Sequence, residues 1–273
     1  MSANTVAILG GGNMGRALIG GLLRRGMRAE KIQVAEVGLD ARAALARDFA
    51  VTASADAAAA VADADVIVLA VKPQDIALLL APLQALLRQN RPLVVSIAAG
   101  VRVASLTHLC GDQVPVVRAM PNRPALVGAG VTGLFAPPAV GAAAREAAAT
   151  LLRAVGEIVW VANEEALDVV TALSGSGPAY FFLLAQEMMQ AAVKLGLEPE
   201  AARKLAVGTL YGAGLLAQAS DGDLQRLRSE VTSKGGTTQA ALQEFASADL
   251  AATVFTALEA ATRRSRELAA HLS

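Results

Sequence analysis

The chain has 273 residues, which is enough for one large domain or two modest ones. Its 24 basic and 24 acidic residues balance, so no surplus of positive charge indicates nucleic acid as a partner. The single cysteine, Cys110, excludes an internal disulfide and is typical of a reducing compartment. Only two histidines are present, which excludes a histidine-rich metal site, and we expect no bound metal.

The apolar content of 54% with only 3% aromatic residues predicts a helix-rich core of alanine, leucine and valine. The first apolar run leads straight into a glycine turn, which is not the pattern of a secretion signal. A window without charges, residues 124–144, contains four glycines and the pair Pro137-Pro138, so it cannot be one membrane-spanning helix. We therefore expect a soluble, cytoplasmic protein with no membrane partner.

The apolar run Thr5–Leu9 predicts a buried strand, and a helix is expected from about Asn13 to Arg25. Between them, Gly10, Gly12 and Gly15 match the pattern G-x-G-x-x-G in the strand–turn–helix setting that a dinucleotide site requires. The first glycine makes a tight turn, the second lets a pyrophosphate approach, and the third permits close packing of helix and strand. The alternative is a glycine-rich turn that binds nothing.

A second strand is predicted from Lys31 to Glu36, and it ends on an acid about 20 residues beyond the glycine pattern. An acid at this place binds the adenosine ribose 2′-hydroxyl of NAD and repels the 2′-phosphate of NADP. Arg42 follows on the next predicted helix and could offset that repulsion. Glu36 therefore favours NAD without excluding NADP, and its alternative is a solvated strand end.

Further strands alternate with helices in the first half, and the predicted strands are 65–71, 93–97, 114–120, 130–135 and 157–161. An alanine-rich helix is expected over residues 139–155. The alternation predicts an α/β fold, a Rossmann-type doubly wound sheet over residues 1–162 with helices on both faces. Lys72 and Pro73 follow one strand, where ligands of such sheets bind, although Lys72 has the alternative of being an ordinary exposed lysine. Ala98 and Ala99 follow the next strand and are small enough for a nicotinamide ring to lie close.

From Asn163 onward the pattern is helical, with helices predicted over 164–173, 179–195, 199–218, 221–230, 239–245 and 249–272. The helix over 179–195 is apolar nearly all round, which predicts burial. Because little in the chain could cover these apolar helices, residues 163–273 are expected to form an all-α domain with a dimer interface.

The segment Val231–Leu242 contains two glycines, Gly235-Gly236, followed by Thr237-Thr238 and a predicted helix. A threonine is a good N-cap, and the unpaired N–H groups of a helix start can bind a small anion such as a carboxylate. The alternative is a capped turn with no ligand.

Six segments resemble pyrroline-5-carboxylate reductases over nearly the whole chain. They are residues 9–15, 70–74, 96–100, 118–122, 173–180 and 231–242, of which the last two are specific to that family. The resemblance implies a Rossmann domain followed by an all-α dimerisation domain that interleaves with its partner, in dimers that often assemble as pentamers of dimers. It also implies hydride transfer from NADPH or NADH to the cyclic imine of pyrroline-5-carboxylate, which yields L-proline.

The resemblance also assigns residues. It places along the cofactor Leu9, Gly10, Gly11, Gly12, Asn13, Met14, Glu36, Ala70, Val71, Lys72, Pro73, Ile97, Ala98 and Ala99. It places at the substrate Glu164, Ser233, Gly236, Thr237 and Thr238. The hydroxyl of Thr238 would hydrogen-bond the ring nitrogen as the catalytic contact, and main-chain N–H groups of 236–238 would hold the substrate carboxylate.

Two residues depart from the family pattern, because Arg123 stands where threonine is usual and Lys234 where proline is frequent. Either cation could attract the substrate carboxylate or point to solvent.

One rival function is a β-hydroxyacid dehydrogenase, whose catalytic lysine would be Lys194 or Lys204. A second rival is a dinucleotide sensor without catalysis, which would need the glycine turn but not segments 173–180 and 231–242.

Overall fold

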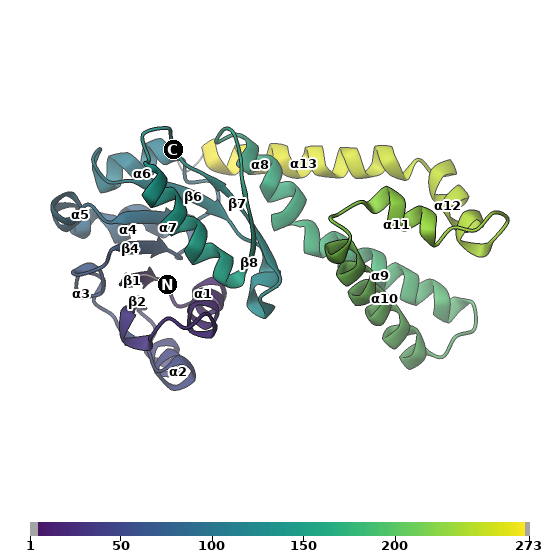
Figure 1. Ribbon diagram of the computed structural model, residues 1–273, viewed down its shortest axis with the longest axis horizontal. Coiled ribbons are helices and arrows are strands. Elements are labelled where there is room, and N and C mark those ends of the chain that lie inside the picture. The colour runs from purple at the N-terminus through teal and green to yellow at the C-terminus, as the bar shows by residue number, and fades with distance from the viewer. Residues whose placement is uncertain (1–4, 271–273) are drawn as a thin grey trace. The chain divides into compact units, whose positions relative to one another are not determined.

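A computed structural model describes residues 5–270, and the chain forms two compact units (Figure 1). Among the described residues, the first unit consists of 5–176 together with 261–270, and the second unit is Gly177–Ala260. The sequence predicted a division at residue 162 instead. The difference arises because hydrogen bonds hold two later helical segments in the sheet-containing unit. Asp168 accepts one from Arg102, and Ser265, near the end of the last helix, donates another to Asp168.

The first unit contains one eight-stranded sheet in the order β3-β2-β1-β4-β5-β6-β7-β8. Its strands are β1 Val6–Leu9, β2 Ile32–Ala35, β3 Thr52–Ser54, β4 Val66–Leu69, β5 Leu93–Ser96, β6 Val116–Met120, β7 Gly130–Phe135 and β8 Gly156–Trp160. All neighbouring strands run parallel except β6 and β7, which are antiparallel. The predicted doubly wound, mostly parallel sheet is confirmed.

Helices cover both faces of this sheet, as Figure 1 shows. They are α1 Asn13–Arg24, α2 Leu39–Phe49, α3 Ala57–Val61, α4 Ile76–Leu80, α5 Gln84–Asn90, α6 Val103–Cys110, α7 Ala142–Leu152 and α8 Ala166–Val170. Residues of β1 alternate between the two cores. Val6 and Ile8 pack with residues of α1, α2 and α7, whereas Ala7 and Leu9 pack with residues of α3 to α6. Burial on both faces explains why the strands are continuous apolar runs.

Two local elements differ from the sequence prediction. The edge strand β3 was not expected, because three residues of mixed polarity give no periodic signal. The helix predicted to end at Leu173 instead passes through a π-helical turn, Thr171–Gly175, and continues into α9. Such turns insert an extra residue into a helix and frequently occur at functional sites.

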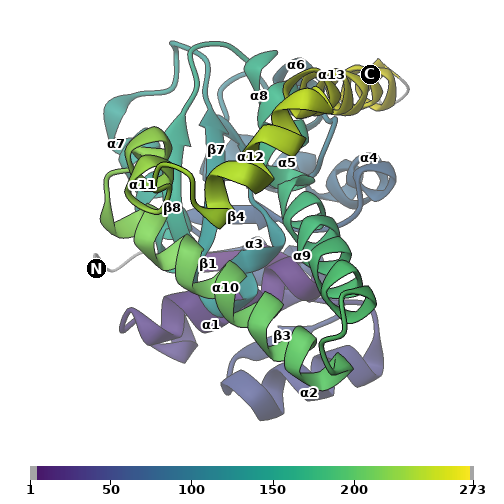
Figure 2. The ribbon, with the colours of Figure 1, turned by 90° about the vertical axis from the view of Figure 1, so that its right-hand side faces the viewer.

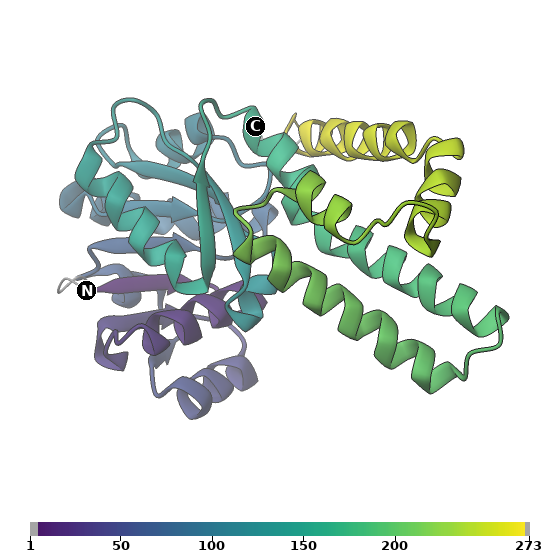
Figure 3. The same ribbon diagram turned by 45° about the vertical axis from the view of Figure 1, so that its right-hand side comes forward.

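The second unit is helical, as predicted, with α9 Gly177–Lys194, α10 Pro199–Ala219, α11 Leu224–Glu230, α12 Thr237–Ser247 and the start of α13 Leu250–Ala270. Helices α9 and α10 pack side by side and are joined by a short turn (Figure 3).

The prediction that the helix over 179–195 is buried is wrong within a single chain. Phe181, Phe182 and Leu183 are each about 60% exposed. Within residues 5–270, one helical stretch, Ala166–Lys194, is long and apolar enough to cross a membrane by length and composition alone. A helix that packs against a second copy of a protein can have the same apolar composition.

Candidate active site

The glycine turn after β1 has the geometry that the fingerprint requires. Gly10 has a φ of +114°, and a Cβ atom there would lie 2.6 Å from the carbonyl oxygen of Ala70. A Cβ atom on Gly15 would lie 2.2 Å from the carbonyl oxygen of Gly10, so both positions exclude a side chain. Gly12 is different, because a Cβ atom there would meet nothing within 4 Å among the described residues. Open space above the second glycine fits the approach of a phosphate group.

The turn also presents unpaired donors. The N–H of Gly10 donates to the carbonyl of Ala35, whereas the N–H groups of Gly12, Asn13 and Met14 have no acceptor among residues 5–270. These groups stand at the N-terminus of α1, where unpaired donors and the helix dipole favour an anion. The residues present therefore fit the pyrophosphate of a dinucleotide.

Glu36 lies at the end of β2, close to the glycine turn. Its carboxylate accepts hydrogen bonds from the N–H groups of Gly11 and Gly38, each at 2.8 Å. Arg42 does not pair with this carboxylate, since its guanidinium donates to the main-chain carbonyls of Glu36 and Val37, also at 2.8 Å. The guanidinium therefore lies beside Glu36, and its offset of the repulsion between this acid and a 2′-phosphate stays a prediction.

The remaining predicted cofactor residues follow β4 and β5. Lys72 and Ala99 are exposed, Ala70, Val71, Pro73 and Ile97 are half-buried, and Ala98 is buried. The side chain of Leu9 is fully buried in the core, so this residue has only its main chain to offer a ligand. A groove of about 460 Å³ lies beyond the carboxyl ends of these two strands. Its lining is mostly apolar and consists of Pro73, Gln74, Ala99, Gly100, Thr171, Ser176, Ala261, Arg264, Ser265 and Leu268.

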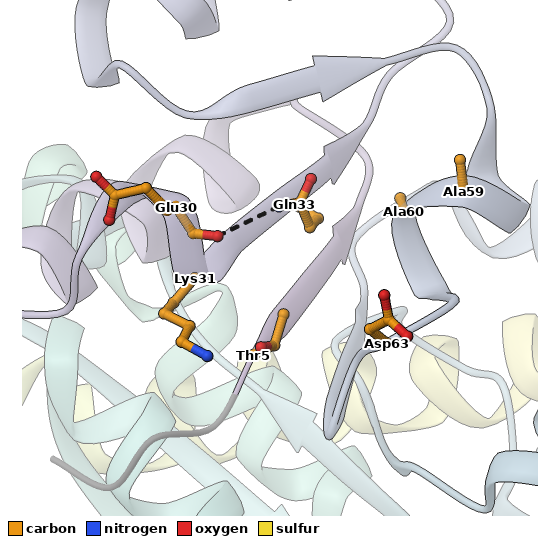
Figure 4. Close-up of a pocket in the computed structure, with 7 residues that line it drawn as sticks. All are labelled: Thr5, Glu30, Lys31, Gln33, Ala59, Ala60 and Asp63. Atoms are coloured by element: carbon orange, nitrogen blue, oxygen red, sulfur yellow. Dashed lines mark hydrogen bonds between the residues drawn. The ribbon is translucent and has the colours of Figure 1, made fainter.

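A separate cavity of about 580 Å³ lies at the amino ends of β1 and β2 (Figure 4). Thr5, Lys31 and Asp63 are among its lining residues. In parallel sheets ligands bind at the carboxyl ends of the strands, which is the opposite edge. This cavity is therefore not the dinucleotide site.

Glu164, a predicted substrate contact, forms an ion pair inside the first unit. Its Oε1 atom accepts from Arg118 at 2.5 Å and from the N–H of Val103 at 2.7 Å. Arg118 is 5% exposed. These bonds attach the chain just before α8 to β6 and to the start of α6.

One turn further along, Asp168 is buried at 2% exposure and was not singled out from the sequence. It accepts from Arg102 and from the hydroxyl of Ser265 on α13, each at 2.8 Å. Asp168 follows Glu164 by four residues in the sequence, and this i, i+4 spacing of acids, typical of one face of a predicted helix, was the available signal. The two acids hold α8 against the segment that follows β5, which carries the predicted cofactor residues 97–99.

Asn122 is a second buried polar residue, and the sequence indicated it only as part of a motif. Its Oδ1 atom accepts from the N–H of Val131, and its Nδ2 group donates to the carbonyl of Ser174 in the π-helical turn. The next residue, Arg123, is exposed and forms no ion pair with any described residue.

The second predicted site lies on the second unit, in the turn that joins α11 and α12 (Figure 2). The predicted threonine N-cap is wrong, because Gly236 is the N-cap and α12 begins at Thr237. The N–H of Gly236 donates to the carbonyl of Ser233, so it is not free for a substrate as was expected. The N–H groups of Thr237, Thr238 and Gln239 have no acceptor in the described part of the chain.

Gly235 has a φ of +72°, which glycine adopts readily, and its N–H donates to the side chain of Gln239 at 2.6 Å. A Cβ atom on Gly236 would lie 2.4 Å from the Oγ of Ser233. The two glycines thus set the shape of the turn. Lys234 is exposed and pairs with no described residue.

The cysteine and the two lysines that were considered as catalytic groups lie in surroundings that do not favour that role. Burial raises the pKa of the Cys110 thiol to about 12, so the thiol is protonated and unreactive at neutral pH. Lys204 is exposed and lies 3.6 Å from Glu200 on its own helix, and Lys194 is an exposed residue at the end of α9. Within residues 5–270, no group of three histidine, cysteine or acidic residues could hold a metal ion.

Comparisons with known proteins agree along the whole chain. The family described as pyrroline-5-carboxylate reductase dimerisation matches residues 164–268, and the family described as NADP oxidoreductase, coenzyme F420-dependent, matches residues 5–100. The pyrroline-5-carboxylate reductase of Pseudomonas aeruginosa is 47% identical over 272 residues, which cover 100% of this chain and 99% of the relative.

This chain belongs to the pyrroline-5-carboxylate reductase family.

Solved structures of the family have the same fold. A pyrroline-5-carboxylate reductase from Coxiella burnetii is 37% identical, with a TM-score of 0.94 over 98% of this chain and 99% of the other. The pyrroline carboxylate reductase of Plasmodium falciparum, solved with NADP bound, is 27% identical, with a TM-score of 0.83 over 98% of this chain and 99% of the other. The predicted resemblance is confirmed, and with it the fold.

In this family member, the buried contacts of Asp168 predict a clear stability effect. We expect Asp168→Ala to lower the free energy of unfolding by about 2–4 kcal/mol, because it leaves Arg102 and Ser265 without their acceptor. Ser265→Ala should cost about 1 kcal/mol, since it removes one hydrogen bond. Urea unfolding of the variants measures both values.

Glu267→Ala is the matched control on α13, the helix that carries Ser265. It removes an ion pair with Arg264 whose side chains are 63% and 47% exposed, so its cost should stay below about 0.5 kcal/mol. If Asp168→Ala cost no more than Glu267→Ala, the buried contacts would not hold α8 and α13 in place.

Proposed function

We propose that the protein reduces the cyclic imine of pyrroline-5-carboxylate to L-proline with NADPH or NADH, the last step of proline biosynthesis. The observation that carries the proposal is the 47% identity to a pyrroline-5-carboxylate reductase over the full chain. The glycine turn with three unpaired N–H groups supports it, because the reaction needs a bound dinucleotide.

The first unit would hold the cofactor. The N–H groups of Gly12, Asn13 and Met14 would bind the pyrophosphate, and Glu36 would face the adenosine ribose. The segments Ala70–Pro73 and Ile97–Ala99, at the carboxyl ends of β4 and β5, would line the rest of the dinucleotide. When bound, the reduced nicotinamide supplies the hydride, and the protein supplies position and charge.

The second unit would hold the substrate at the start of α12. The N–H groups of Thr237, Thr238 and Gln239 are unpaired and stand at the positive end of a helix dipole, so they suit the substrate carboxylate. Ser233 and Gly236 would shape this turn through the hydrogen bond from the N–H of Gly236 to the carbonyl of Ser233. Glu164, held by Arg118, would act on the substrate through its charge.

Thr238 would be the catalytic residue. Its side chain is half-buried in the first turn of α12, where its hydroxyl can bond the ring nitrogen of an imine whose carboxylate is held by the helix start. A protonated iminium accepts hydride without a general acid, and a hydroxyl that holds the nitrogen and its proton is sufficient. Orienting two reactants in this way can contribute ~7–11 kcal/mol in favourable cases.

The activity and the role of Thr238 are tested together by following NADH and NADPH oxidation with pyrroline-5-carboxylate. We expect the wild type to oxidise cofactor only when this imine is present, which neither a dehydrogenase of β-hydroxyacids nor a sensor would do. In the same assay, Thr238→Ala should lower kcat/KM by about tenfold or more, which corresponds to ~1.4 kcal/mol.

Ser247→Ala removes a hydroxyl from the opposite end of α12, where it donates to the carbonyl of Glu244. Its kcat/KM should stay within about threefold of the wild type. A loss below about threefold, ~0.7 kcal/mol, in Thr238→Ala would remove the proposed role of this residue. No oxidation with the imine would refute the proposed reaction.

We further propose a cytoplasmic homodimer formed through the second unit, in which dimers can assemble as pentamers of dimers. The family match over residues 164–268 is to a dimerisation region. Helices α9 and α10 expose large apolar side chains, including Phe181, Phe182, Leu205 and Tyr211, each 60–69% exposed. A surface of this kind is typical of an interface between proteins.

Light scattering after gel filtration tests this assembly. The wild type should have at least twice the mass of one chain, 27.8 kDa, and Phe181→Glu should shift the mass towards the single chain because it places a charge in the interface. Leu78→Glu alters an equally apolar residue on α4, 81% exposed, and should leave the mass unchanged. A wild type with the mass of one chain would contradict the proposed dimer.

A further inference from the structure

The turn after β5 carries the predicted cofactor residues 97–99 but has few hydrogen bonds of its own. The N–H of Ile97 donates to the carbonyl of Leu69 at 3.1 Å, which continues the pairing of β4 and β5. Ale99 and Gly100 follow in the turn, where Gly100 has a φ of +79°, and their N–H groups have no acceptor among residues 5–270. Apart from buried side chains within it, the position of this turn therefore depends on how the chain directly after it is held.

Arg102 and Val103 follow this turn, and each is held by an acid at or just before α8. The Nη2 group of Arg102 donates to Oδ2 of Asp168 at 2.8 Å, and the N–H of Val103 donates to Glu164 at 2.7 Å. The side chain of Asp168 is 2% exposed and that of Arg102 is 22% exposed, so this ion pair lies largely out of water. Such a pair keeps its geometry, because opening it would leave a buried charge without a partner.

Among the described residues, Asp168 is the sole hydrogen-bond partner of the Arg102 side chain. The Nη1 atom of Arg102 is buried and has no acceptor in the part of the chain that the structure describes. Asp168 is itself fixed at its other oxygen, Oδ1, by the hydroxyl of Ser265 at 2.8 Å. Arg102 is thus a single link between the turn after β5 and a carboxylate that is held in place.

We propose that Arg102 is a positioning residue for hydride transfer, which fixes residues 97–101 against the nicotinamide ring through its bond to Asp168. The inference rests on the proposed function, in which residues 97–99 line the nicotinamide. Reacting atoms must lie about 3–3.5 Å apart, and a misplacement of about 1 Å can cost about 10²-fold in rate. The glycine turn would hold the pyrophosphate and the second unit the substrate, so loss of the link should slow the hydride step and leave both binding steps nearly unchanged.

Steady-state kinetics with pyrroline-5-carboxylate test this role in Arg102→Met, which removes the link but keeps an unbranched side chain. We expect kcat to fall at least about tenfold, while KM for the imine and the dissociation constant of the reduced cofactor stay within about threefold of the wild type. The isotope effect on kcat, measured with cofactor deuterated at C4, should rise because the chemical step becomes slower relative to the other steps. Arg102→Lys can still donate to Asp168 and should recover most of kcat.

Arg145→Met is the matched control, because Arg145 is also half-buried and also holds a segment that follows a strand. Its guanidinium donates to the carbonyls of Ala136, Pro137 and Val140, a segment with no proposed cofactor or substrate residue. Its kcat should stay within about threefold of the wild type. An unchanged kcat in Arg102→Met, a loss accounted for by KM or by cofactor binding, or an equal loss in Arg145→Met would overturn the inference.

A second variant and a measurement without substrate keep the test decisive. If Arg102→Met does not fold, the double variant Arg102→Met with Asp168→Leu replaces the buried pair by apolar side chains, which is often tolerated, and should show the same loss of kcat. Without substrate, the fluorescence lifetime of the bound reduced nicotinamide should shorten in Arg102→Met but not in Arg145→Met, because a ring without fixed support is more mobile. A wild type that does not reduce the imine would refute the reaction alone, and an unchanged lifetime in Arg102→Met would overturn the inference.

Discussion

The close approach of main-chain segments at Gly10 and Gly15 determines the position of the glycine turn that would bind the dinucleotide. At Gly10 the turn passes the carbonyl of Ala70 so closely that no Cβ atom fits, and Gly15 passes Gly10 even more closely. These contacts place the N-terminus of α1 over the carboxyl edge of the sheet. The unpaired N–H groups of Gly12, Asn13 and Met14 and the fixed carboxylate of Glu36 follow from that placement.

Buried charges connect this edge to later parts of the chain. Glu164 and Asp168 bind Arg118, Arg102 and Ser265, which lie on β6, on the segment after β5 and on α13. Burying a carboxylate is costly unless it is paired and hydrogen-bonded, and both acids meet this condition. Asp168, which attaches α13, therefore also holds, together with Glu164, the segment that would line the nicotinamide.

The doubly wound sheet was predictable because strands buried on both faces leave continuous apolar runs, and the glycine turn has a fixed spacing. The N-cap of α12 and the main-chain partners of Arg42 were not predictable in the same way. Each depends on which of several nearby acceptors a donor reaches, and sequence spacing does not decide that choice. Asp168 was missed for a related reason, since its partners are 66 and 97 residues away in the chain. The apolar surface of α9 was assigned wrongly to the interior of one chain, because an apolar composition alone does not say which surface covers it.

In the proposed reaction, the hydrogen gained by the imine carbon comes directly from the bound nicotinamide. This transfer is tested most directly with NADH that carries deuterium at C4, in the two stereoisomeric forms, and mass spectrometry of the product. We expect one of the two forms to yield proline with a single deuterium at C5 and the other to yield unlabelled proline. Proline without deuterium from either form, or no proline at all, would contradict it.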